Sequence, residues 1–161
     1  MTPHEIDDVH RLRVMAAGVR GAKVVERVLP APFEEVWPVM AGLDFLPDLG
    51  HTRLLSAQGD RIELLARSRY GFRAHLRGFR RPGWCWLQSR FLLVGLAAAP
   101  VPGGTRIALT GGVRVPTRAA VIPFGTLPEL TTAATRLTTR VTGTHGVSSG
   151  SGPGRPPRPR P

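Results

Sequence analysis

Cysteine, lysine and tyrosine are almost missing from this sequence of 161 residues, which has one cysteine, Cys85, one lysine and one tyrosine. A single cysteine excludes an intramolecular disulfide and a cysteine metal cluster. Long hydrophobic runs are missing too, because the longest one, residues 91–101, is too short to cross a membrane. The charged N-terminal residues are unlike a secretory signal. These absences predict a reduced, cytoplasmic protein with the length of one domain.

Acidic residues are scarce in the second part of the chain, although the first part is rich in them. Residues 1–63 hold ten acidic against seven basic side chains, whereas residues 64–161 hold one acid, Glu129, and fifteen arginines. The formal net charge of +11 can attract an anionic partner. The excess of arginine over lysine is also typical of a GC-rich genome, so nucleic acid is not the partner that we expect. A peripheral contact with an anionic membrane stays open.

Three segments have the apolar spacing and the end signals of amphipathic helices. The first covers residues 2–18, the second begins at Pro32, and the third covers residues 126–143. Pro38 should kink or shorten the second helix, because proline lacks the amide hydrogen that the helix needs there. The apolar faces that we expect to be buried are Ile6, Val9, Leu12 and Ala16 in the first helix, Phe33, Val36, Trp37 and Met40 in the second, and Leu130, Ala133, Ala134, Leu137 and Val141 in the third.

Hydrophobicity with a period of two predicts a strand at residues 23–29 and, after the second helix, a meander of about six strands. Residues 61–68 and 72–79 form a hairpin in this prediction, with Ser68 opposite Phe72.

Turn signals order the later strands of the meander. A four-residue turn at residues 80–83 would pair Phe79 with Trp84, and a turn at residues 102–104 precedes the last strand. Gly95 is the sole candidate for a turn inside the long apolar run. The predicted strands are each apolar on one face.

Four segments, in this order of elements, carry a likeness to a known family. They are VVERVLPAPFEEVWPVM at 24–40, GDRIELLARSRYGFRA at 59–74, RPGWCWLQSRF at 81–91 and PGGTRIAL at 102–109. Together they resemble the START-like SRPBCC superfamily, which includes lipid-transfer domains and polyketide cyclase/dehydrase-like proteins. The resemblance covers about residues 22–143.

The fold that this resemblance implies is α+β. It is a helix-grip fold, in which a curved antiparallel sheet of about seven strands surrounds a long C-terminal helix, with an extra N-terminal helix here. Residues 1–21 would be a helical extension and residues 22–145 the helix-grip domain. Residues 146–161 are rich in Gly, Ser, Pro and Arg, which predicts a disordered tail.

The resemblance also implies a cavity between the sheet and the C-terminal helix. Small inward residues such as Ala66 and Ala74 would leave volume there, whereas a solid core would favour leucine and isoleucine. The alternative is that large neighbours fill these gaps. The implied lining consists of Trp37, Met40, Leu64, Ala66, Ser68, Tyr70, Phe72, Ala74, Leu76, Cys85, Leu87, Ser89, Phe91, Leu109, Leu130, Ala134 and Leu137.

Binding or transfer of a small hydrophobic molecule, without covalent chemistry or a cofactor, is the leading functional hypothesis. The alternative is an enzyme of the polyketide cyclase or aromatase kind, in which Tyr70, Ser68, Ser89 or His51 would move a proton. No catalytic residue carries over from the superfamily, because its members share none.

A second alternative is a basic surface that binds nucleic acid or an anionic membrane. Trp84 and Trp86 fall on the outer face of the predicted sheet with Arg73, Arg77 and Arg90. Cover from the N-terminal helix, or a ladder of cross-strand contacts, would explain the same pattern structurally. No metal site is expected because no HExxH motif or paired histidines occur, and Cys85 is expected to be buried and inert.

Overall fold

The computed structural model describes residues 7–46, 49, 51–67, 71, 73–113 and 126–144. In chain order, the elements of this part are α1 (Asp8–Ala17), β1 (Lys23–Leu29), α2 (Phe33–Ala41), β2 (His51–Gln58), β3 (Arg61–Arg67), β4 (Arg73–Arg81), β5 (Trp84–Gln88), β6 (Leu92–Val101), β7 (Gly104–Val113) and α3 (Leu127–Thr144). The predicted tail and the predicted start of the first helix lie outside the described residues.

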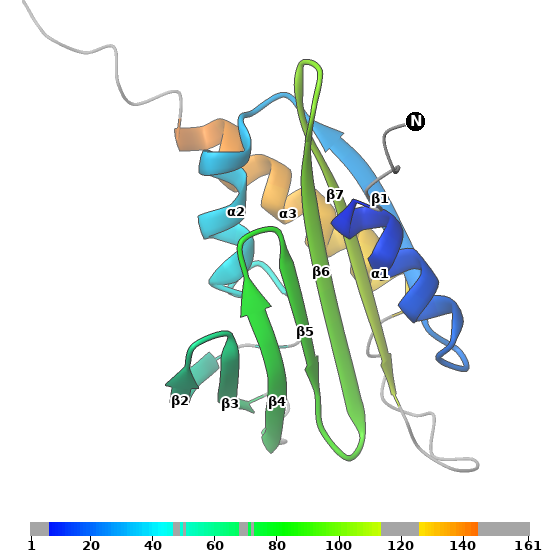
Figure 1. Ribbon diagram of the computed structural model, residues 1–161, viewed down its shortest axis with the longest axis vertical. Coiled ribbons are helices and arrows are strands. Elements are labelled where there is room, and N and C mark those ends of the chain that lie inside the picture. The colour runs from blue at the N-terminus through cyan, green and yellow to red at the C-terminus, as the bar shows by residue number, and fades with distance from the viewer. Residues whose placement is uncertain are drawn as a thin grey trace, which may run out of the picture.

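The described strands form one antiparallel sheet of seven strands in the order β1-β7-β6-β5-β4-β3-β2. Strands β2 to β7 are a meander, and β1 adds to it beside β7. The sheet curves, with α3 on its inner face and α1 on its outer face (Figure 1). The predicted α+β helix-grip architecture is therefore confirmed.

The predicted register is correct between β3 and β4 and wrong between β4 and β5. Ala66 lies opposite Ala74, which is the pairing that the predicted hairpin requires. Between β4 and β5, however, Arg81 pairs with Trp84, because the turn has two residues and Gly83 takes a φ of +81°. Proline followed by a glycine with positive φ forms a compact turn of two residues. The prediction of a four-residue turn at residues 80–83 was therefore wrong. The error is a shift of two residues, which leaves every side chain on its predicted face.

Gly95 lies in the middle of β6 and does not form the predicted turn. The chain reverses at residues 89–91 instead, where the Ser89 hydroxyl accepts hydrogen bonds from the backbone N–H groups of Phe91 (3.2 Å) and Leu92 (2.9 Å). A Cβ atom on Gly95 would lie 2.8 Å from the side chain of Leu12 in α1. Glycine at this position therefore lets α1 approach the sheet closely.

Helix α1 covers a second, smaller core on the outer face of the sheet. Its Val9 and Leu12 pack with Trp84 and with alanines of β6 and β7. Ion pairs tie the first residue and the middle of the helix to the sheet, since Asp8 contacts Arg81 (2.7 Å) and Arg13 contacts Glu26 (2.7 Å). Asp7 caps the helix by accepting the backbone N–H of His10.

The main core lies on the inner face, between the sheet, α2 and α3. The predicted apolar stripe of α3 is buried along its whole length, from Leu130 to Val141. Val36, Trp37 and Met40 bury the matching face of α2. Pro38 is exposed on the other side of this helix, which continues through it to Ala41. Among the described residues, no helix has the length and apolar content to cross a membrane.

Candidate functional site

Eleven of the predicted cavity residues meet in one cluster of buried side chains on the inner face. They come from α2, from β3, β4, β5 and β7, and from α3, which converge although they are far apart in the sequence. The eleven are Trp37, Met40, Leu64, Ala66, Leu76, Cys85, Leu87, Leu109, Leu130, Ala134 and Leu137. Several of them, including Met40 and Leu76, have no exposed surface, so they pack directly against neighbours.

The structure describes three of the other six predicted lining residues. Ser68, Tyr70 and Phe72 lie outside the described residues. Ala74 is half-buried on the inner face, whereas Ser89 is used in the turn between β5 and β6. Phe91 is 51 % exposed, which corrects its predicted inward position. The strict alternation assumed for residues 85–91 ends at Gln88, where β5 ends, so Phe91 turns outward.

The inner face continues beyond the helices toward the edge of the sheet. Helix α3 packs on β1, β7 and α2, whereas β2, β3 and β4 form a separate wall at the lower left of Figure 1. On this wall Thr52 lies opposite Ala66, which lies opposite Ala74. Leu54 lies opposite the buried Leu64 and yet is 50 % exposed. We call Thr52, Leu54, Ala66 and Ala74 the inner arm face.

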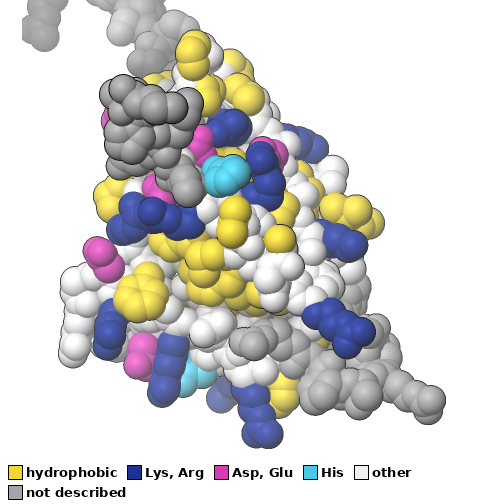
Figure 2. All heavy atoms as spheres, turned by 45° about the vertical axis from the view of Figure 1, so that its right-hand side comes forward, with side chains coloured by type: hydrophobic (Ala, Val, Ile, Leu, Met, Phe, Trp, Pro, Cys, Tyr) yellow, Lys and Arg dark blue, Asp and Glu magenta, His cyan; other side chains and the backbone are white. Residues whose placement is uncertain are grey.

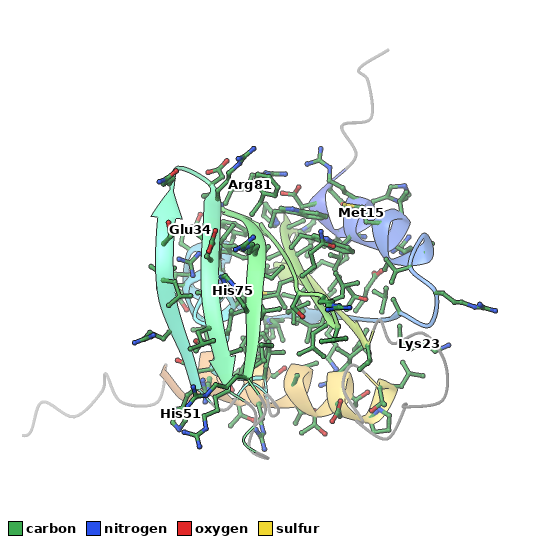
Figure 3. All side chains as sticks on the ribbon, turned by 90° about the horizontal axis from the view of Figure 1, so that it is seen from below. Met15, Lys23, Glu34, His51, His75 and Arg81 are labelled. Carbon is green, nitrogen blue, oxygen red and sulfur yellow. The ribbon has the colours of Figure 1, made fainter. Side chains whose placement is uncertain are left out.

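The view from below shows the strands of this wall and α3, which lies along the concave side of the sheet (Figure 3). The inner arm face has one hydroxyl and three aliphatic side chains, and two of the aliphatic residues are alanines. Ala66 is buried in the main core cluster, so Thr52, Leu54 and Ala74 around it are the members with exposed surface. The arrangement offers apolar contact and no charge.

An open pocket of about 400 Å³ lies at the other end of the sheet. The β1–α2 connection and the hairpin between β6 and β7 form it, and its lining consists of Pro30, Ala31, Pro32, Phe33, Glu34, Pro100, Val101, Gly103 and Gly104. Sequence reasoning missed this pocket. Both proline-rich turns were recognised, but nothing local in the sequence indicates that they lie side by side.

The ionisable groups near the core do not form a reactive set. Burial raises the pKa of the Cys85 thiol to about 12, and the nearby Arg80 guanidinium offsets only part of this effect. The thiol is therefore protonated at neutral pH and a poor nucleophile, as expected. Arg80 itself donates to the carbonyl oxygen of Ala41 at the end of α2 (3.1 Å). In the described part of the chain, no three His, Cys, Asp or Glu side chains are grouped as metal ligands would be.

The two described residues considered for proton transfer, His51 and Ser89, are not brought together. His51 is exposed at the start of the edge strand β2, and its pairing with Arg67 places it on the outer face. Ser89 lies in the turn between β5 and β6. The remaining two, Ser68 and Tyr70, fall outside the described ranges.

The two tryptophans of the outer face are at least partly covered. Trp84 is 6 % exposed beneath α1, and its ring stacks beside Trp86 with centroids 6.3 Å apart. The guanidinium group of Arg11 lies 5.9 Å from the centre of the Trp84 ring. Packing beneath the N-terminal helix α1 therefore explains why a tryptophan lies on the outer face at position 84. Trp84 is not part of an open basic surface.

Comparisons with known proteins give a likeness of structure only. No family model and no curated protein matches the sequence. Among solved structures, TTHA0849 from Thermus thermophilus is 18 % identical and superposes with a TM-score of 0.54, covering 76 % of this chain and 98 % of its own. DR_A0006 from Deinococcus radiodurans is 16 % identical, with a TM-score of 0.52 over 77 % of this chain and 99 % of its own. CV1439 from Chromobacterium violaceum is 17 % identical, with a TM-score of 0.51 over 76 % and 98 %. This chain shares their fold.

Proposed function

We propose that the protein binds a small hydrophobic molecule between the inner arm face and α3. The proposal extends the resemblance to the SRPBCC superfamily from fold to function. It involves no covalent step and no cofactor, and a cytoplasmic carrier is the form that we favour.

One observation carries this proposal: the apolar inner face extends past the helices that cover the core. Leu54 is 50 % exposed and Ala74 is half-buried, although Leu64, which lies opposite Leu54, and Leu76, two residues from Ala74 on the same face, are buried. Apolar surface that remains open on the concave side of a sheet is where a hydrophobic ligand gains most from burial. The single hydroxyl of Thr52 could accept or donate one orienting hydrogen bond.

The cyclase alternative has less support. It needs a polar group that faces the ligand space, and of the named candidates that the structure describes, His51 points outward while Ser89 holds a turn. We therefore give binding precedence over catalysis.

Ala74→Leu should weaken the binding of an apolar fluorescent probe to the full chain and leave thermal stability unchanged. The added side chain would enter space on the inner arm face that a ligand would otherwise fill, so nothing has to move. Probe titration measures the first effect and a melting curve the second.

The matched control is Ala17→Leu, because Ala17 is exposed on α1 and remote from the inner face. Val101→Trp would instead fill the open pocket at the other end of the sheet. Loss of probe binding in Ala74→Leu alone supports the proposal. Loss in Val101→Trp alone would move the site to the open pocket, and absence of probe binding to the parent protein would refute the proposal.

A further inference from the structure

Basic side chains form a row across three strands on the outer face of the sheet. His51 of β2 lies opposite Arg67 of β3, which in turn lies opposite Arg73 of β4. Arg53 projects from the same face of β2, opposite Leu65. All four of these side chains are exposed. We call His51, Arg53, Arg67 and Arg73 the basic row.

This arrangement opposes the stability of the sheet. Like charges at directly opposite positions of an antiparallel pair destabilise it, and Arg67 and Arg73 are such a pair. Within the described residues, neither of them nor Arg53 has a carboxylate partner. A local arrangement that costs stability without a compensating contact is typical of a functional surface.

The acidic side chains of the described chain do not neutralise this row. Glu63, on the same face of β3, is already engaged by His75 (2.9 Å) and Arg77 (3.6 Å). Asp7 and Asp8 are paired with arginines at the opposite end of the sheet. Figure 2 shows several basic side chains near the lower edge of the molecule, with an acidic and a histidine side chain among them. The row is thus complementary to a partner with closely spaced negative charges.

An exposed aromatic residue lies at the same end of the sheet as the basic row. The turn between β5 and β6 carries Phe91, which is 51 % exposed, with the guanidinium of Arg90 5.5 Å from its ring centre. Leu55 of β2, the strand that carries His51 and Arg53, is also 45 % exposed. Basic groups beside protruding apolar side chains suit the interface of an anionic bilayer, where the former meet headgroups and the latter enter the acyl boundary.

A single-stranded nucleic acid fits this surface less well. Binding of that kind uses several aromatic rings on which successive bases stack. On the outer face of β3 and β4 the exposed ring is Phe79, which is at the far end of the strands and already contacted by Arg61 at 5.7 Å.

We propose that the basic row, together with the Arg90–Phe91 turn, docks the protein on the surface of an anionic phospholipid bilayer. The docking does not depend on the ligand proposed above, because it uses the outer face of the sheet.

The test is sedimentation of the full chain with vesicles of phosphatidylcholine, with and without phosphatidylserine. The parent protein should bind only the vesicles that contain phosphatidylserine. The double variant Arg67→Gln/Arg73→Gln should bind them at least about tenfold more weakly, since each arginine near an anionic surface contributes substantially to partition. Its melting temperature should be equal or higher, because the variant removes a like-charge pair. Phe91→Ser should weaken binding without changing the net charge.

The control Arg20→Gln/Arg136→Gln removes the same charge from exposed arginines outside the row. Equal loss of binding in the control would overturn the proposal, because net charge rather than the row would then be responsible. Failure of the parent protein to bind phosphatidylserine vesicles would also overturn it. A single-stranded DNA oligonucleotide at the same salt concentration is the last arm. Binding to DNA that the row variant abolishes, without binding to vesicles, would identify nucleic acid as the partner and refute membrane docking.

Discussion

Trp37→Ala should lower the free energy of unfolding by about 3–5 kcal/mol, the range for truncation of a buried aromatic side chain. The Trp37 side chain is 9 % exposed and stacks parallel to Phe33, with ring centroids 6.4 Å apart. It belongs to the main core cluster, in which α2 meets α3. Alanine would leave a cavity that the surrounding backbone cannot close. Denaturant-induced unfolding followed by circular dichroism measures the loss.

The matched control for this truncation is Phe79→Ala. Phe79 is also aromatic but is 48 % exposed on the outer face of β4. Its truncation should cost about 1 kcal/mol or less, mostly from lost contact with Arg61. Equal losses in the two variants would mean that α2 does not anchor the core through Trp37.

Gly78→Ala should destabilise the fold by more than about 3 kcal/mol, an effect beyond ordinary surface substitutions. Gly78 lies in β4 opposite Leu87, and a Cβ atom built on it would overlap the backbone carbonyl of Trp86 in β5. A backbone atom held in a ladder of hydrogen bonds cannot rotate away as a side chain can. Glycine within a strand permits the bend that a sheet needs to curve around a helix. Alanine must therefore separate β4 from β5 or flatten the sheet.

Gly112→Ala is the control, because Gly112 also lies within a strand but has room for a side chain. The nearest atom to its added Cβ would be 3.8 Å away. We expect a change within about 1 kcal/mol, in either direction. Similar unfolding free energies for the two alanine variants would contradict the close approach of β4 and β5 at Gly78.

The sequence allowed prediction of those features that local patterns determine. The stripe of α3 from Leu130 to Val141 was predicted in full, because a period of 3.6 residues specifies which side chains share a helix face. The register of β3 against β4 was predicted from the loop length and from the alternation of apolar residues. With a loop of three residues, the predicted pairing places the apolar residues of both strands on the same buried face.

Features that depend on contacts between distant segments were not predicted. Gly95 was read as a turn residue, although it lies where α1 meets β6, and only the packed structure reveals that contact. The sequence did indicate that something covers the outer face of β6. This strand is apolar on both of its faces, and strands of that kind are covered on both sides. Its small outward residues, such as Ala97 and Ala99, admit a helix at short distance.

The candidate site was predicted in part for the same reason. Alternation correctly placed Leu64, Leu76 and Leu87 on the inner face. It failed at Phe91, where a turn interrupts the strand, and it gave no information on how far α3 reaches across the sheet. That reach decides which part of the inner face is core and which part is open to a ligand.

The most direct test of ligand binding is a native mass spectrum of the full chain, purified gently and then incubated with a panel of apolar compounds. Binding on the inner arm face predicts a species heavier than the bare chain by the mass of one small molecule. That species should be lost in Ala74→Leu and kept in Ala17→Leu. A spectrum that shows only the bare chain before and after incubation would contradict the proposed function.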